Sequence, residues 1–390
     1  MKEVNTGLDR LLGSNLNAIK GREIGLITNH TGVTKEFNKG YKLLHRSGVK
    51  IKYLFGPEHG FTGARGEGAS VPDDSEETEN IPIISLYGEK LRPPEEVVKD
   101  LDLLIYDIQD LGIRCYTYIY TMVNSLKVAA ETGTKFSILD RPPPLSGELF
   151  EGKPIEETQK SFIGNYGLPM VYGLSPGELG KYVSDVFQID IDPEIYRMKG
   201  WKRELWFDET DLPWVSPSPG IPDFKTSLVY PATVLFEATN ISEGRGTARP
   251  FKYFGAPWLD SGLIQEIRRI SSEFDLEGYK LRPCHFTPYS SKYKGEECLG
   301  YEIYINDRQQ IRPFTFGLLL VKVIHDLYRS DFTWWNPSLN RGGPYFDKLA
   351  GSAEFRAIIE KTNRVFELLK LAEKGVSDFR GKASNYFLYE

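Results

Sequence analysis

The sequence predicts an α/β protein: a Rossmann-like parallel sheet with helices on both faces, plus a smaller C-terminal α/β domain. In the first half, short apolar segments alternate with helical segments, which is the pattern of a parallel sheet covered by helices. A proline-rich stretch at residues 213–222 interrupts this pattern, and a second group of helices and strands follows it. A chain of 390 residues is long enough for two domains. We expect them at residues 1–225 and 226–390.

The elements follow from the periodicity of the apolar residues. In the first half we expect strands at 23–28, 51–55, 81–86, 101–108 and 135–139, with helices at 38–47, from residue 93, and at 117–132. The alternation is predicted to continue with a strand at 170–172, a helix at 176–187 and a strand at 195–199. In the second half we expect helices at 260–275, 315–329 and 353–373 and strands at 280–287 and 299–305. The acidic segment 73–79 reads as a solvated loop.

The composition is that of an ordinary soluble globular protein, with 40% hydrophobic and 26% charged residues. A net charge of −6 argues against a nucleic-acid partner. No 18-residue apolar run predicts a membrane span. The N-terminus lacks the apolar region of a signal peptide, so we expect a cytoplasmic location, or a secreted or periplasmic one if a leader has been removed.

Cysteine and histidine usage predicts neither a metal nor a cofactor. The 3 cysteines are too few for a disulfide scaffold, although Cys284 and Cys298 could pair across a hairpin. The 5 histidines show no metal-ligand spacing. No glycine-rich segment completes a dinucleotide or phosphate-binding motif.

Polar clusters follow four of the predicted strands. They lie at residues 29–32, 57–60, 107–110 and 140–144. Ligands of doubly wound sheets bind beyond the carboxyl ends of the parallel strands. One such loop could be a solvated turn, but four on the same edge favour a binding or catalytic site.

A G-x-S-x-G pattern at residues 173–177 resembles the nucleophile elbow of a hydrolase, but it predicts a helix start instead. In an elbow, the residue after the serine donates its backbone N–H to the oxyanion, and Pro176 has none. Ser175 is the expected N-cap, with Glu178 completing a capping box.

Two further segments mix charges with aromatic or glycine residues. Residues 237–251 contain Glu243, Arg245 and Arg249, and these arginines could hold an acidic ligand or form ion pairs between domains. Residues 107–118 combine acids, Arg114 and Tyr116 in a way that suits a sugar site or the start of a buried helix.

An ordered set of motifs resembles a known family. It comprises GLITNHTG at 25–32, PEHGF at 57–61, SLYG at 85–88, DIQD at 107–110, TY at 117–118, LDRP at 139–142, PSPGIP at 217–222, TNISEGRGT at 239–247 and GAPW at 255–258. The chain thereby resembles the exo-β-N-acetylmuramidases of the NamZ type. The resemblance implies an exo-acting glycosidase that removes terminal N-acetylmuramic acid from the non-reducing end of peptidoglycan fragments. It also implies a Rossmann-like catalytic domain, a smaller C-terminal domain and a cleft between them.

The resemblance places the family's catalytic glutamate at Glu58. A general acid that works near neutral pH needs an apolar or crowded setting, which Phe55 and Phe61 could supply. Pro143 and Tyr172 depart from residues common in the family, which leaves the substrate preference open.

The second catalytic group is left open among Asp107, Asp110, Asp140, Glu243 and the substrate's own N-acetyl group. The lactyl carboxylate of muramic acid calls for a cation, and Arg141, Arg245 and Arg249 are the candidates. The full set of predicted substrate-binding residues is Asn29, His59, Asp107, Gln109, Asp110, Arg114, Tyr116, Asp140, Arg141, Glu243, Arg245 and Arg249.

Two other functions are compatible with the same scaffold. A non-catalytic protein that binds or senses muropeptides would hold the sugar without releasing a product. A metal-dependent deacetylase or esterase is disfavoured by the missing metal spacing.

Overall fold

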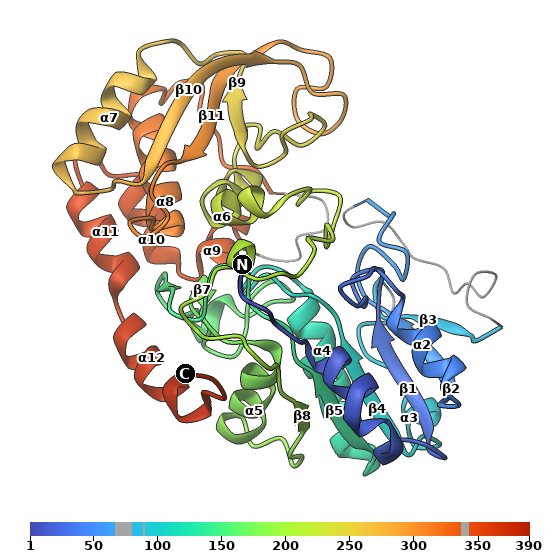
Figure 1. Ribbon diagram of the computed structural model, residues 1–390. Coiled ribbons are helices and arrows are strands. Elements are labelled where there is room, and N and C mark those ends of the chain that lie inside the picture. Colours follow the sequence, from blue (N-terminus) through green and yellow to red (C-terminus); the bar gives the residue numbers. More distant parts are fainter. Residues whose placement is uncertain (67–79, 89, 337–342) are drawn as a thin grey trace.

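A six-stranded parallel sheet forms the centre of the first half of the molecule, as predicted (Figure 1). The computed structural model describes residues 1–66, 80–88, 90–336 and 343–390, so the acidic segment 73–79 lies outside the described residues. The strand order is β3-β2-β1-β4-β5-β8 and all neighbours are parallel. The strands are β1 (Glu23–Thr28), β2 (Lys50–Gly56), β3 (Ile83–Ser85), β4 (Leu103–Asp107), β5 (Lys135–Leu139) and β8 (Glu194–Tyr196).

Helices cover both faces of this sheet, because its strands are apolar on both sides. On one face Leu26 and Ile105 pack with Leu8 and Leu44, which belong to α1 (Gly7–Arg10) and α2 (Gly40–Arg46). On the other face the alternate strand residues pack against α3 (Glu95–Val98), α4 (Tyr118–Thr132) and α5 (Pro176–Val186). The predicted Rossmann-like layout is confirmed.

The second half is smaller and is built on an antiparallel sheet of order β10-β11-β9. Its strands are β9 (Tyr253–Ala256), β10 (Tyr279–Phe286) and β11 (Cys298–Ile305). Its helices are α6 (Phe224–Thr233), α7 (Leu263–Glu273), α8 (Pro313–Leu327), α9 (Tyr345–Ala350), α10 (Ala353–Ile359), α11 (Val365–Glu373) and α12 (Val376–Ala383). Short 3-10 or π turns occupy Leu11–Asn15, Leu16–Ala18, Glu157–Gln159, Phe207–Glu209, Val234–Ala238 and Ser384–Tyr386.

Several elements differ from the prediction, which did not include α1, α9, α12, β6 (Phe150–Glu151) and β9. The strand expected at 170–172 is β7 (Val171–Tyr172), which pairs antiparallel with β6 outside the central sheet, where β8 takes the place beside β5. The helix expected at 353–373 is broken between α10 and α11, where Asn363 adopts a left-handed φ of 55°. Helix α6 was not predicted, although the Asp223 side chain caps its first turn by accepting from the Thr226 N–H at 2.7 Å.

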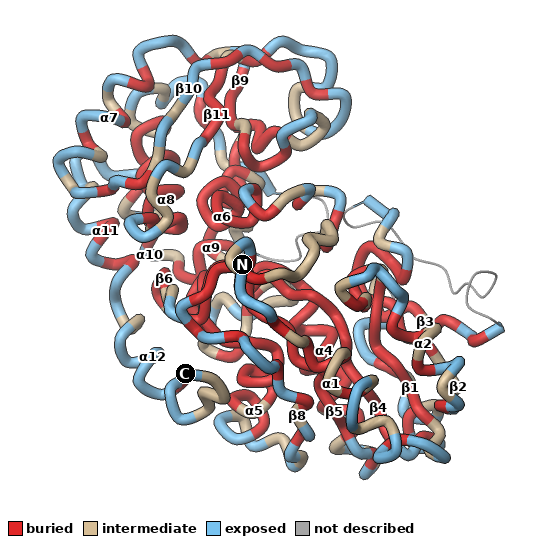
Figure 2. Tube along the Cα trace, viewed as in Figure 1, coloured by how far each residue is buried: buried red, intermediate tan, exposed pale blue. Residues whose placement is uncertain are grey.

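The two halves share one continuous apolar core, which contains residues of α4 and of α8 (Figure 2). Helices α11 and α12 run from the smaller half back to the larger one, and the chain ends beside α5 (Figure 1). There the Arg203 N–H donates to the Glu390 carbonyl at 3.0 Å. The two halves are therefore joined both by the core and by the C-terminal segment.

Two further findings concern the described residues. Their helices are too short or too polar to cross a membrane. The three cysteines are free, so Cys284 and Cys298 do not form the disulfide considered above.

Candidate active site

The site residues gather where the strand order of the central sheet reverses, between β1 and β4. Such a switch point leaves a crevice beyond the carboxyl ends of the two strands, because the following loops run to opposite sides. Thr28 at the end of β1 pairs with Asp107 at the end of β4, and the Thr28 hydroxyl donates to the Asp107 carbonyl at 2.9 Å. The loops after β1, β2 and β4 therefore start from one rim.

The loop after β2 folds back on itself immediately beyond Glu58. His59 and Gly60 both have left-handed backbones, with φ of 68° and 78°. This conformation is uncommon for a residue with a side chain and concentrates at functional sites. The His59 imidazole Nδ1 bonds the Arg65 carbonyl at 2.9 Å. At Gly63 the loop approaches His30 so closely that a Cβ would lie 2.0 Å from its ring, so only glycine fits.

Glu58 lies on this rim as a buried carboxyl, only 7% exposed. The hydroxyl of Thr117 donates to its Oε2 at 2.6 Å. Thr117 immediately precedes α4, so the first turn of that helix fixes the orientation of the carboxyl.

Tyr118, the first residue of α4, lies between Glu58 and the linker that joins the two halves. Its hydroxyl donates to the Pro217 carbonyl at 2.6 Å, and its ring meets that of His59 edge-on at 6.5 Å. Burial raises the pKa of Tyr118, and the charge of Glu58 raises it further. The phenol is therefore neutral at physiological pH and acts as a hydrogen-bond donor.

The linker connects this rim to the C-terminal half. The Ser216 carbonyl bonds Nε2 of His30 at 2.6 Å, and Pro217 receives the Tyr118 hydroxyl. Three residues later, a Cβ on Gly220 would lie 3.3 Å from Nη1 of Arg245. Arg245 therefore lies beside the same short linker that contacts the rim near Glu58.

Aromatic rings fill the space between Glu58 and Arg245. Tyr116 packs edge-on against Tyr118 at 4.9 Å and against Tyr230 at 6.2 Å, and Tyr230 continues to Phe251 at 4.6 Å. The Arg245 guanidinium lies over the Phe251 ring at 4.7 Å. A run of aromatic rings beside polar groups is the usual surface for an amphipathic ligand such as a sugar.

Arg245 also takes part in a charged cluster. It donates to Glu237 at 2.7 Å and lies 3.5 Å from Glu243, which in turn pairs with Lys292 at 2.9 Å. Burial alone would raise the pKa of Glu243, but Lys292 and Arg245 lower it below its usual value. Glu243 is therefore an ionised partner of two cations.

Four buried polar atoms on the rim take part in no well-formed hydrogen bond within the described part of the chain. They are Nδ2 of Asn29, Nδ1 of His30, Oδ1 of Asp110 and the hydroxyl of Tyr116. Unsatisfied buried polar atoms are rare in native proteins and concentrate where a ligand completes the bonding. Donors and acceptors of this kind match the hydroxyl and amide groups of an amino sugar.

Three predicted site residues serve mainly to hold the rim together. Arg141 donates from Nε to Asp107 at 2.7 Å, and both side chains are buried. The Gln109 amide donates to the carbonyls of Asp110 and Pro142, at 2.8 Å each. The cavity beside Thr31, Gln109 and Arg141 measures about 20 Å³, which holds about one water molecule and no sugar.

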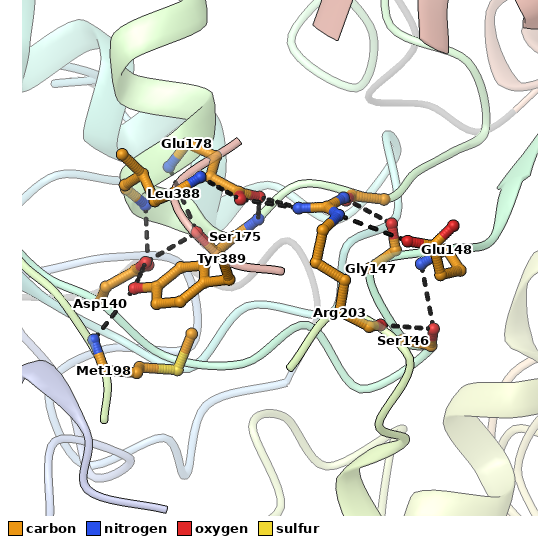
Figure 3. A network of polar contacts seen from close by, with 12 residues as sticks. Asp140, Ser146, Gly147, Glu148, Ser175, Glu178, Met198, Arg203, Leu388 and Tyr389 are labelled. Atoms are coloured by element: carbon orange, nitrogen blue, oxygen red, sulfur yellow. Dashed lines mark hydrogen bonds and ion pairs between the residues drawn. The ribbon is translucent and has the colours of Figure 1, made fainter. Parts of the chain in front are cut away.

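Asp140, another predicted contact, lies in a separate buried network instead of on the rim (Figure 3). It accepts from the Ser175 hydroxyl at 2.7 Å, from the Gly177 N–H at 2.8 Å and from the Tyr389 hydroxyl at 2.5 Å. Ser175 caps α5 together with Glu178, as predicted, and is not a nucleophile.

Two predicted arginines also lie outside the rim group. Arg114 is fully buried and donates to the carbonyls of Lys153, Leu168 and Leu349, so it joins the two halves. Arg249 is half-exposed and lies 3.9 Å from Glu302 on β11. Arg245 therefore lies apart from Arg141 and Arg249, next to the aromatic rings.

The rim also contains groups that the prediction did not include as site residues. Thr117 and Tyr118 were only part of a family motif, Glu237 only began the charged segment 237–251, and Tyr230 lies in a segment without a recognisable pattern. Among the described residues, no group of three or more histidine, cysteine or acidic side chains could hold a metal ion.

The fold and this rim define a class of two-domain α/β protein. Its site lies at the switch point of a parallel sheet, where a buried carboxyl accepts a hydrogen bond from a hydroxyl and aromatic rings form one wall. The family itself follows from comparison. Models described as "Exo-beta-N-acetylmuramidase NamZ", N-terminal and C-terminal, match residues 24–225 and 228–389, so the chain belongs to this family.

Relatives cover the whole chain. The chain is 40% identical over 388 residues to "Peptidoglycan beta-N-acetylmuramidase NamZ" of Bacillus subtilis (strain 168), covering 99% of this chain and 92% of the relative. It is also similar to two crystal structures of DUF1343 family proteins from Bacteroides fragilis NCTC 9343. One has a TM-score of 0.89 at 31% identity, the other 0.78 at 27%, and each match covers 100% of this chain and 99% of the other.

Proposed function

We propose that this protein is an exo-acting glycoside hydrolase that releases terminal β-1,4-linked N-acetylmuramic acid from the non-reducing end of peptidoglycan fragments. The observation that carries the proposal is the match of both halves to the NamZ family, together with the 40% identity to a peptidoglycan β-N-acetylmuramidase. The buried carboxyl of Glu58 at the switch point gives this chemistry a location.

Glu58 is the proposed general acid. Cleavage of a glycosidic bond requires a proton on the leaving oxygen, and a carboxylic acid beside the bond normally supplies it. The hydrogen bond from Thr117 holds the carboxyl in one orientation, and positioning of this kind makes proton transfer efficient. His59, whose ring is fixed by the Arg65 carbonyl, is placed to bind a sugar hydroxyl.

Arg245 is the proposed partner of the lactyl carboxylate that distinguishes muramic acid from glucosamine. Its guanidinium is held flat over Phe251 by the ring and by Glu237, a geometry suited to a planar carboxylate. The other two candidate cations are committed elsewhere, Arg141 to Asp107 and Arg249 to the edge of the smaller sheet.

The substitution Glu58→Gln tests the catalytic role. It preserves shape and removes the transferable proton, so we expect muramic acid release from N-acetylmuramyl-β-1,4-N-acetylglucosamine to fall by at least ~100-fold. Thermal unfolding should change little. Release is measured by chromatography of the products.

The matched control is Glu157→Gln, the same change at a side chain that is 80% exposed and pairs with Lys160. It should retain full activity. Activity of Glu58→Gln within a few-fold of the wild type would remove Glu58 from the mechanism. A wild-type protein that binds the disaccharide without cleaving it would instead support a muropeptide-binding protein.

A further inference from the structure

Four rim or near-rim carboxylates other than Glu58 could act at the anomeric carbon, and three of them are already neutralised or fully bonded. Asp107 pairs with Arg141 at 2.7 Å, and Glu243 pairs with Lys292 at 2.9 Å. Asp140 accepts from Ser175, Gly177 and Tyr389 and has no exposed surface. Each of these three carboxylates is thus already engaged by a cation or by several hydrogen bonds.

Asp110 is different. Its Oδ2 accepts from the Gly112 N–H at 2.7 Å and from the Tyr172 hydroxyl, which fixes the carboxyl. Its Oδ1 receives no well-formed hydrogen bond, and no ion pair reaches the residue, within the described ranges, although the nearby Leu111 N–H lowers the pKa of the carboxyl. The side chain is 3% exposed, so Oδ1 is a buried acceptor that lacks a well-formed hydrogen bond.

Asp110 and Glu58 follow different strands at the same edge of the sheet. Glu58 follows β2 and Asp110 follows β4, and β1 lies between these two strands. Two strand spacings amount to ~10 Å. The phenol of Tyr118 is near both carboxyls, since the charges of Glu58 and Asp110 both raise its pKa.

A separation of this size is closer to the wider of the two usual glycosidase geometries. Carboxyls that act as acid and base around a water molecule are about 6.5–9.5 Å apart, whereas an acid and a nucleophile are about 5–5.5 Å apart. The wider arrangement inverts the configuration at the anomeric carbon, because the water attacks from the face opposite the leaving group.

We propose that Asp110 is the general base of this site. The inference rests on the proposed glycosidase function. The oxygen of a water molecule forms a bond to C1 of the muramyl residue while the C1–O4 bond breaks. Oδ1 of Asp110 takes a proton from that water, and Glu58 gives its proton to the departing O4. The first product is therefore the α-anomer of N-acetylmuramic acid.

The surroundings of Asp110 are consistent with a base that works near neutral pH. Burial raises the pKa of Asp110 to about 6, against the lowering effect of the Tyr172 and Gly112 hydrogen bonds. The titratable groups that face it are Tyr106 of β4, Tyr116 and Tyr118 at the start of α4, and Tyr172 of β7. Burial raises the pKa of each of these phenols, so they are neutral when Asp110 ionises. Wild-type kcat/KM should accordingly rise as the pH increases through about 6.

The first test needs no variant. Wild-type protein is incubated with N-acetylmuramyl-β-1,4-N-acetylglucosamine, and the anomeric proton of the released sugar is followed by NMR from the first turnover. The proposal predicts the α-anomer before mutarotation. A β-anomer as first product would overturn it, while no release at all would instead overturn the proposed function.

The second test uses Asp110→Ala with sodium azide. The variant should lose at least ~100-fold in kcat/KM. Azide, which needs no base, should restore turnover and yield an α-muramyl azide. The matched control is Asp192→Asn, since Asp192 is exposed and pairs only with Lys181 among the described residues. Activity of Asp110→Ala within threefold of the wild type, or a loss that azide does not restore in a folded variant, would overturn the assignment.

Discussion

At the scale of residues, the site is distinguished by how its charges are paired. Most charged side chains on the rim are held by a partner of opposite sign, as Arg141 and Asp107 are. Arg245 is paired as well, with Glu237 and Glu243, but it lies at the linker beside the aromatic wall and is 23% exposed. A partly exposed guanidinium beside an aromatic surface is suited to the carboxylate of muramic acid.

The substitution Arg245→Met should therefore change substrate choice. Methionine keeps the packing on Phe251 and removes the charge, so kcat/KM for a muramyl substrate should fall about 10- to 100-fold, corresponding to a charged hydrogen bond. The glucosaminyl analogue, which lacks the lactyl group, should be affected little. Initial rates on both substrates give the comparison.

Arg269→Met is the matched control, since Arg269 forms only exposed pairs with Glu266 and Glu273 on α7. It should leave both rates unchanged. Equal losses on the two substrates with Arg245→Met would mean that Arg245 is structural, through its pair with Glu237.

The residues show what sequence can and cannot predict about such a site. Glu58, Asn29 and Asp110 follow strands whose apolar pattern is unambiguous, so their place on the rim was predictable. The burial of Arg114 and Asp140 was not, because their partners are distant in sequence: Leu349 for Arg114 and Tyr389 for Asp140. Thr117 and Tyr118 were missed as site residues because hydroxyl side chains at the start of a helix are usually explained by helix capping or by packing in the core.

At the scale of elements, the long regular segments were predictable and the short or broken ones were not. β5 has the predicted bounds, and α4 is within a residue of them, since apolar periodicity and flanking turns define both. β7 has only two residues, too few for a period to specify its partner strand. The break between α10 and α11 depends on the left-handed backbone of Asn363, which no apolar pattern reveals.

The element that joins the two halves most specifically is the C-terminal segment after α12 (Figure 3). Glu178 of α5 is fully buried and accepts from Arg203 at 2.7 Å and from the Leu388 N–H at 2.9 Å. Arg203 also stacks on Phe387 at 3.4 Å. A single buried ion pair therefore supports the start of α5, the chain near Arg203 and the end of the molecule.

Glu178→Gln should destabilise the protein strongly. It leaves the buried Arg203 charge with only the more distant Glu148, at 3.7 Å, as a counter-ion, and breaking a buried pair typically costs about 3–5 kcal/mol. Urea unfolding monitored by circular dichroism measures the change. Glu131→Gln is the control, because Glu131 pairs with Arg92 at the surface, where such a pair contributes about 0–1 kcal/mol. Similar small losses for both variants would show that the buried network does not stabilise the junction.

At the scale of the whole molecule, the site depends on both halves. The Rossmann-like half supplies Glu58 and Asp110, the smaller half supplies Arg245 and Phe251, and residues 216–220 of the linker contact both sets. The shared core and the C-terminal segment hold this arrangement together. The protein thus carries its proposed acid and its proposed carboxylate partner on different halves that share one core.

The central claim is that this chain removes a terminal muramic acid residue in strong preference to any other sugar. The most direct measurement compares two disaccharides of the same composition, N-acetylmuramyl-β-1,4-N-acetylglucosamine and N-acetylglucosaminyl-β-1,4-N-acetylmuramic acid. The account predicts that the first is hydrolysed to its two sugars and that the second is left intact, because only the first presents muramic acid at the non-reducing end. Hydrolysis of the second at a comparable rate, or of neither, would contradict it.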